Sequence, residues 1–365
     1  MLFFRAALAL LVLSMPLHAR AEEAADARQA LHLLNRLGYG PAPGDVARVQ
    51  AMGPRAYVDS RLAQLDGKPV LPPWLGARLR ELEEMQAGES GAGADALARE
   101  ERLLRAIASP RQLEEVLLGF WLGHFGITAG EGMAPAVIAA IERQALRPQL
   151  FGRYSALRAA VMRHPAMHGR PVGGEREARR ALARYFVSRP TAALERSLAR
   201  TWERSGGDQR TVLRALLGSP DFLAPLDAGS REKDAFRFVV SAVRMSGLHV
   251  ENAAPLVDVL ERAGTPVYGL GGPMTAAARA DFVARLGNGR LPLALAPPRP
   301  HRQASSAPPM RVGVEGDMGG MVAQPGPVLT DAPTPAAAAM AAARSRPADA
   351  ERLVGMLMDD AFLRY

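Results

Sequence analysis

Trp121 and His124 are the first candidates for chemistry, because they lie three positions apart in an apolar segment. On a helix this spacing would place an aromatic ring and a titratable imidazole on one face, where they can form a surface for a ligand or a partner. The simpler interpretation is that Phe120, Trp121 and Phe125 belong to the core and that His124 hydrogen-bonds a buried carbonyl group. We favour the core interpretation and keep the surface as the alternative.

His164 and His168 have the i, i+4 spacing at which two imidazoles on a helix can share one metal ion. The zinc-protease pattern with this spacing also needs a glutamate between the histidines, and Pro165 and Ala166 occupy those positions. Pro165 also favours a helix boundary there. The sequence therefore predicts no metal and no cofactor at this segment.

Arg36 lies among leucines, which predicts a half-buried guanidinium. We expect it to pair with a carboxylate such as Asp45 or Glu114 rather than with a substrate. If the protein is an enzyme, Arg36, His124 and His164 are its candidate catalytic residues and should surround one cleft.

A third class of site would use soft ligands near the C-terminal end of the chain. His301, Met310, Met318 and Met321 are residue types that bind copper(I). Their irregular spacing makes a copper site the least favoured alternative. The chain has no cysteine, which excludes Cys-ligated zinc and iron–sulfur sites.

The composition is that of a folded chain with an arginine-rich surface. Its 365 residues include 48% hydrophobic residues, which argues against a fully disordered protein. The net charge of +8 comes almost entirely from arginine, since Lys68 and Lys233 are the only lysines. Many arginines alternate with glutamate, and aromatic residues are only 5% of the chain, which predicts a solvated surface and no nucleic-acid partner.

The N-terminus predicts a signal peptide at residues 1–21. Arg5 precedes a twelve-residue apolar run, 6–17, and small residues at 19 and 21 form a cleavage site near Ala21. Twelve helical residues span about 18 Å, which is too short for a bilayer core of about 30 Å. We therefore expect a periplasmic or secreted protein that begins at Glu22 and keeps no transmembrane anchor.

The remainder predicts an all-α fold, an irregular multi-helix orthogonal bundle formed mainly by residues 22–290. Asp45 is expected to cap one helix that continues to Leu62, and Ser109 is expected to cap another with Pro110 at its first position. Apolar residues at helical spacing predict further helices at 96–107, 113–125, 134–146, 153–163, 175–187, 191–204, 208–217, 232–246, 252–263 and 275–286.

The last part of the chain is expected to differ from the helical domain. Residues 291–335 are rich in proline, glycine and methionine and lack hydrophobic periodicity, which predicts a disordered loop. Residues 336–365 regain apolar spacing, and we expect C-terminal helices there that dock on the main domain.

Several segments, taken in order, resemble the exported bacterial family described as domain of unknown function (DUF) 1800. They are HLLNRLGYGP at 32–41, GPRAYV at 53–58, SPRQLEE at 109–115, FWLGHF at 120–125, YFV at 185–187, LRALLGSPDFL at 213–223, VYG at 267–269 and DAFLR at 360–364. The resemblance covers most of the chain after the signal peptide.

The resemblance also implies what this chain has lost. Family members carry a central asparagine–glutamate–asparagine block, and this sequence passes from Met167 to Glu175 without it. Gly123 stands where the family has asparagine. The resemblance implies no reaction, and it suggests an exported sulfatase-like protein of the DUF 1501 family as a partner. We therefore expect an exported, non-catalytic protein that acts through protein contacts; the alternative is a degenerate hydrolase-like enzyme of the cell envelope.

Overall fold

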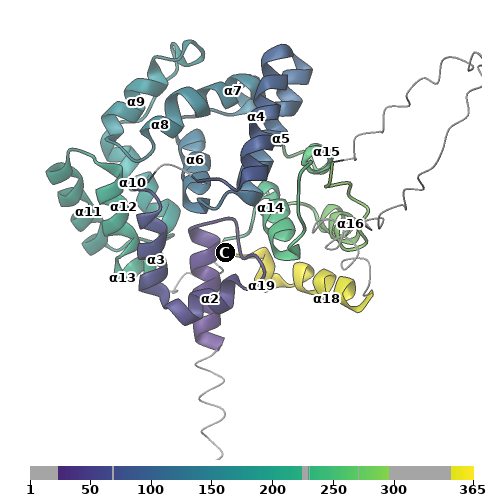
Figure 1. Cartoon of the computed structure of the whole chain (residues 1–365). Helices are drawn as coiled ribbons and strands as arrows, with labels where there is room; N and C mark the ends of the chain where they lie inside the picture. The colour runs from purple at the N-terminus through teal and green to yellow at the C-terminus, as the bar shows by residue number, and fades with distance from the viewer. Residues whose placement is uncertain (1–23, 68–69, 224–228, 230, 270, 296–346) are drawn as a thin grey trace, which may run out of the picture. The chain divides into compact units, whose positions relative to one another are not determined.

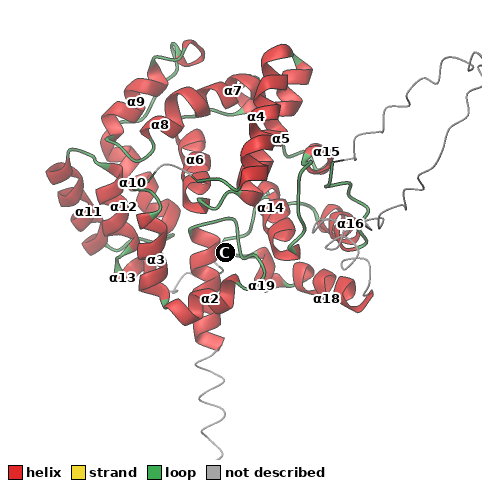
Figure 2. Cartoon of the chain, in the orientation of Figure 1, coloured by secondary structure: helices red, strands yellow, loops and turns green. Residues whose placement is uncertain are grey.

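The computed structural model describes residues 24–67, 70–223, 229, 231–269, 271–295 and 347–365. Within these ranges the chain forms helices joined by loops and contains no strand, so the all-α prediction is confirmed (Figures 1 and 2). The described residues up to 294 and from 348 onward form one compact unit. None of the described helices combines the length and the apolar character needed to cross a bilayer.

The helices follow one another with short connections. Residues 24–36 are helical. The later helices are α2 (Asp45–Met52), α3 (Pro54–Ala63), α4 (Pro73–Gly88), α5 (Ala92–Ala108), α6 (Gln112–His124), η1 (Ala129–Glu131), α7 (Pro135–Ile141), η2 (Glu142–Leu146), α8 (Arg147–Gln149), α9 (Tyr154–Met162), η3 (Pro165–Met167), α10 (Glu175–Phe186), α11 (Ala192–Ser205), α12 (Gln209–Leu217), α13 (Pro220–Leu223), α14 (Ala235–Ser246), α15 (Ala254–Arg262), α16 (Ala276–Gly287), α18 (Pro347–Met358) and α19 (Asp360–Leu363).

Helix α5 is central, since it contacts α4, α6, α7, α14 and α15. Apolar residues such as Leu103 and Leu104 are fully buried, as expected for a helix covered on several sides. Three charged residues of the same helix, Glu100, Glu101 and Arg102, are also buried. A helix of this kind needs ionic partners on its neighbours, because an unpaired buried charge is costly.

Side-chain caps set the start of several helices. The side chains of Thr191, Asp208, Asp234 and Thr275 accept hydrogen bonds from the first-turn backbone N–H groups of α11, α12, α14 and α16. The predicted helices at 191–204, 208–217, 232–246 and 275–286 correspond to these four.

Two predicted helix starts are wrong. The helix expected from Asp45 to Leu62 is divided at Gly53, whose φ of 82° is left-handed, and Pro54 begins a new helix. Asp45 is the first residue of α2 rather than its cap, and its Oδ2 accepts the backbone N–H of Ala42. Helix α6 has Arg111 at its N-cap position, so Ser109 does not cap it.

The C-terminal helix α19 contacts the start of α14. The rings of Phe362 and Phe238 lie 5.8 Å apart between centroids, and the backbone N–H of Lys233 donates to the carbonyl of Leu363 at 2.8 Å. The predicted signal peptide at 1–21 and residues 296–335 of the predicted loop lie outside the described residues. The same is true of the predicted C-terminal helical residues 336–346.

Candidate functional site

A cavity of about 440 Å³ lies between α6, α10, the start of α14 and residues 265–269. Aromatic side chains form much of its wall, namely Tyr39, Phe120, Tyr185, Phe236, Tyr268 and Tyr365. Four ionisable side chains also line it, namely Arg102, His124, Asp234 and Arg237. Small-molecule sites usually enclose about 300–1,000 Å³ with mainly apolar walls and a few polar groups, so this cavity suits a small organic molecule.

Helical spacing brings the lining residues of each element to one face. On α6 the lining residues are Gly119, Phe120, Leu122, Gly123 and His124, which lie at positions i, i+1, i+3, i+4 and i+5. The two glycines add no side chain to the cavity, although glycine inside a helix costs about 1 kcal/mol relative to alanine. Ala181 and Tyr185, four positions apart, line the cavity from α10.

Arg237 is a buried cation without a carboxylate bound to its guanidinium. It is 7% exposed; its Nη1 donates to the carbonyl of Asn35 at 3.2 Å and its Nη2 to the Tyr185 hydroxyl at 2.6 Å. The rings of Tyr39, Tyr185 and Tyr365 lie 5.2, 5.9 and 4.6 Å from the guanidinium carbon. Among the described residues, no carboxylate forms an ion pair with this side chain, so neutral groups hold it.

Asp234 is the acidic residue closest in sequence to this cation, but it serves the backbone. Its Oδ1 accepts the backbone N–H of Arg237 at 2.7 Å and thereby caps α14. Burial raises the pKa of Asp234, and the charge of Arg237 opposes this rise. Burial would lower the pKa of Arg237, but Tyr185 and other neighbours raise it above its ordinary value, so Arg237 remains cationic.

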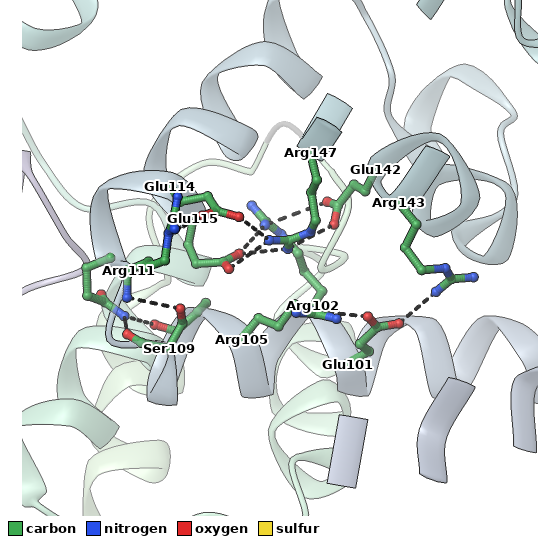
Figure 3. Close-up of polar contacts among 12 residues, drawn as sticks. Glu101, Arg102, Arg105, Ser109, Arg111, Glu114, Glu115, Glu142, Arg143 and Arg147 are labelled. Atoms are coloured by element: carbon green, nitrogen blue, oxygen red, sulfur yellow. Dashed lines mark hydrogen bonds and ion pairs between the residues drawn. The ribbon is translucent and has the colours of Figure 1, made fainter. Parts of the chain in front are cut away.

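Arg102, the second arginine of the cavity wall, is neutralised by an ionic network (Figure 3). It is 3% exposed, and its Nη1 lies 3.4 Å from Glu115 and 3.6 Å from Glu142. Its Nη2 donates to the Tyr39 hydroxyl at 3.4 Å. Arg147 binds the same Glu115 at 2.9 Å. This network leaves Arg237 as the cavity cation that lacks a carboxylate partner among the described residues.

His124 lines the cavity, and its ring stacks on Phe120 with centroids 5.8 Å apart. Burial lowers the pKa of His124, so its imidazole is neutral at pH 7. Its Nε2 atom is buried and has no hydrogen-bond partner in the described part of the chain. The expected hydrogen bond from His124 to a buried carbonyl is therefore not formed by this nitrogen.

Arg36 contacts the cavity wall from behind. Its Nη1 donates to the carbonyl of Tyr185 at 3.2 Å, and its guanidinium carbon lies 5.0 Å from the centre of the Tyr365 ring. The predicted pairing with Asp45 or Glu114 is wrong, because these carboxylates pair with other arginines, Arg48, Arg244, Arg111 and Arg147.

Trp121 lies in the core, which rules out the predicted Trp121 surface. Its side chain is fully buried, and the ring of Tyr154 lies 5.5 Å from it. Phe120 and Phe125 are buried as well, which agrees with the core interpretation of this segment.

The candidate catalytic residues His124, His164 and Arg36 do not surround one cleft. His124 lines the cavity, Arg36 lies behind its wall, and His164 is absent from the lining. His164 precedes the short 3₁₀ helix η3, and its Nδ1 accepts the backbone N–H of Ala166 at 3.3 Å.

No metal centre emerges from the described residues. They contain no group of three or more histidine, aspartate and glutamate side chains that could hold a metal ion. Because η3 separates His164 from His168, the two imidazoles do not share a face of an α-helix. The candidate copper ligands His301, Met310, Met318 and Met321 lie outside the described residues.

Sequence reasoning missed Arg237 and the tyrosines around it. A signal for Arg237 was present, since Phe236, Phe238, Val239 and Val240 surround it in the chain. A charged residue inside such an apolar run is a candidate for burial with its neighbours, where it needs polar partners. No comparable signal marks Tyr39 or Tyr365, because they reach the cavity only through the fold.

Comparison with known proteins gives one match. The model of the family described as protein of unknown function (DUF1800) matches residues 32–168 and 176–282. The match is interrupted between residues 168 and 176. No curated protein and no solved structure matches the chain.

Proposed function

This chain belongs to the DUF1800 family, and we propose that it is a non-catalytic binding protein whose cavity holds a small organic anion. The single observation that carries the proposal is Arg237, a buried cation on the wall of a cavity of about 440 Å³. A guanidinium is charged at all relevant pH values and binds carboxylate or phosphate groups through two parallel hydrogen bonds.

The donors of Arg237 allow such a contact. A guanidinium has five N–H groups, and the described residues accept hydrogen bonds from Nη1 and Nη2 only. An anion in the cavity would neutralise the side chain without competing with a protein carboxylate. Because an uncompensated buried charge is costly, neutralisation by a ligand is a favourable contribution to binding.

The aromatic wall defines the rest of the ligand. Phe120, Phe236 and Tyr268 present apolar surface to the cavity. Burial of apolar ligand surface contributes roughly 25 cal/mol per Å². The expected ligand therefore joins one carboxylate or phosphate group to a compact apolar or aromatic body.

The dispersal of the candidate catalytic residues supports a binding role over the enzyme alternative. A general acid or base must lie within hydrogen-bond reach of the substrate proton that it transfers. Arg36 and His164 do not line the cavity that His124 lines. The enzyme alternative would require turnover by the purified protein that disappears when His124 is replaced by glutamine.

The binding test uses the full chain and a panel of aromatic and aliphatic carboxylates and phosphate esters. Calorimetry should show one site for at least one anion and no binding of the matched uncharged amide. Arg237→Lys should weaken that binding by tenfold or more, because lysine cannot form the two-bond contact; Ala181→Phe, which fills the cavity and leaves Arg237 in place, should abolish it.

Arg244→Lys is the matched control, since Arg244 is a partly buried arginine of the same helix that donates to the carbonyls of Gly40 and Ile107 and does not line the cavity. It should bind the anion as the wild type does. Failure of every anion to bind, or equal binding by Ala181→Phe and the wild type, would refute the proposal.

Location and partner complete the proposal. The signal-like N-terminus supports a periplasmic or secreted protein, and N-terminal sequencing of the exported form should begin at Glu22.

Family resemblance supports an exported sulfatase-like partner of the DUF 1501 family. Co-expression followed by affinity purification should recover a stoichiometric complex of the two chains; recovery of this chain alone would contradict the partner.

A further inference from the structure

The positive charge of the chain is concentrated in one stretch of sequence. Residues 153–214 contain fourteen arginines and five acidic residues, a net charge of +9, whereas the whole chain carries +8. The rest of the chain is therefore close to neutral. This stretch holds α9, α10, α11 and α12 (Figure 1).

Two helices of this stretch each expose a row of arginines. On α10 the row is Arg176, Arg180 and Arg184, and on α11 it is Arg196, Arg200 and Arg204; all six are exposed. Residues four apart on a helix lie on one face and are separated by about 6 Å along its axis. Each helix therefore carries three guanidinium groups in a line.

The rows lie opposite the buried faces of their helices. The buried residues of α10 include Ala178, Leu182 and Phe186, each two positions, or about 200°, from an arginine of the row. Leu194, Leu198 and Trp202 have the same relation to the row on α11. Helices α10 and α11 contact each other, and we call their two rows of exposed arginines the α10–α11 basic surface.

The arginines of the α10–α11 basic surface have no acidic partner among the described residues. By contrast, Arg210 and Arg214 on the neighbouring α12 both pair with Asp66, at 3.2 and 3.0 Å. Ion pairs also neutralise Arg102, Arg105, Arg111 and Arg143, which are buried or partly buried. An unneutralised row of arginines is the arrangement that attracts a polyanion.

We propose that the α10–α11 basic surface binds the phosphate headgroups of an anionic bilayer. A cluster of four to eight basic residues on amphipathic helices is typical of proteins that bind anionic lipids at the membrane surface. The aromatic residues of these two helices do not favour single-stranded nucleic acid, since Phe186 and Trp202 are buried and Tyr185 lines the cavity. The surface also lacks exposed large apolar residues, so the contact is electrostatic and peripheral.

The test measures binding of the full chain to vesicles by co-sedimentation. The two vesicle types are phosphatidylcholine alone and phosphatidylcholine with about one-third phosphatidylglycerol. The wild type should bind the anionic vesicles only, and the binding should weaken as salt screens the charges. Each basic residue near the bilayer raises the binding constant about fivefold. Replacing Arg196, Arg200 and Arg204 together by glutamine should therefore weaken binding about 100-fold.

The matched control replaces Arg55, Arg80 and Arg290 by glutamine, because these arginines are exposed and lie outside the α10–α11 basic surface. It has the same net charge as the Arg196, Arg200 and Arg204 triple variant and should bind nearly as well as the wild type. Equal losses in the two variants would overturn the proposal, since only overall charge would then matter. Absence of vesicle binding, or tighter binding to a nucleic-acid oligomer or an acidic protein, would also overturn it. Circular dichroism verifies that both variants remain helical.

Discussion

The ammonium group of Lys233 lies 3.8 Å from the centre of the Phe362 ring, which links the start of α14 to α19. The same Nζ donates a hydrogen bond to Ser241 at 2.9 Å. Lys233 is 4% exposed, and burial, reinforced by the charge of Arg237, lowers its pKa to about 7. A lysine whose pKa is lowered to about 7 therefore contributes to the contact between α14 and α19.

Replacement of Lys233 by methionine should make the free energy of unfolding depend less on pH in the alkaline range. Between about pH 7 and the ordinary lysine value, the unfolded chain holds a proton on Lys233 and the folded chain does not, so wild-type stability rises with pH. The difference in unfolding free energy between the two proteins should change by up to about 5 kcal/mol across this window, with the variant favoured below pH 7. Urea denaturation at a series of pH values measures it; parallel curves for the two proteins would contradict the lowered pKa.

Glu115→Gln should destabilise the fold by about 3–5 kcal/mol, because it leaves Arg102 and Arg147 buried without their shared carboxylate. Burial alone would raise the pKa of Glu115, but Arg147 and Arg102 hold it below the ordinary value. Its contribution is therefore present above pH 4.5 and is lost as pH falls through the lower folded-state value.

Thermal or urea unfolding at neutral and acid pH measures this contribution. Glu81→Gln is the control, since Glu81 is an exposed partner of Arg78 and should cost less than about 1 kcal/mol. If the two variants had the same stability, the buried network would have no special energetic role.

Helix positions could be predicted from this sequence because the signals are local. The helix expected at 208–217 is observed at Gln209–Leu217, with Asp208 as its cap. The prediction failed at Asp45, because the preceding Gly44 occupies the N-cap position. Glycine and aspartate can both precede a helix, so the residue types alone do not show which of the two is the cap.

The cavity could not be predicted in the same way, because its residues are far apart in sequence. Tyr39, Tyr185 and Arg237 meet only after the first helix, α10 and α14 have packed. Their partners are aromatic rings and backbone carbonyls rather than carboxylates, and such partners leave no charge pattern in the sequence. His124 was found because a helix of apolar residues makes a histidine conspicuous.

Gly119→Ala should destabilise the protein although alanine is the better helix former. A Cβ atom at this position would lie 3.2 Å from both Arg102 Nη2 and Tyr39 Oη, which are held by the ionic network and cannot move freely. We expect a net loss of about 1–2 kcal/mol, because crowding in a packed interior outweighs the gain of about 1 kcal/mol in helix propensity.

Gly76→Ala in α4 is the matched control for this glycine. Its Cβ would have only Arg80 Nη1 as a close neighbour, at 3.6 Å, so the alanine should stabilise the protein slightly. Denaturant midpoints of the two variants test the comparison, and a stabilising Gly119→Ala would show that the cavity wall tolerates a methyl group.

His124 should make anion binding in the cavity stronger at acid pH. Burial lowers the pKa of His124 below its ordinary value of 6.5, so the ring is neutral at pH 7 and gains a proton as pH falls below that value. A second cation on the cavity wall then joins Arg237, and an anion in the cavity raises the pKa of His124 in turn. The calorimetric affinity of the wild type for the bound anion should therefore rise as the pH is lowered from 7.5, and His124→Gln should remove this rise.

His249→Gln is the control, because His249 is a half-exposed histidine outside the cavity. This variant should keep the pH dependence of the wild type. A pH dependence that persists in His124→Gln would assign it to the ligand or to another cavity group such as Asp234.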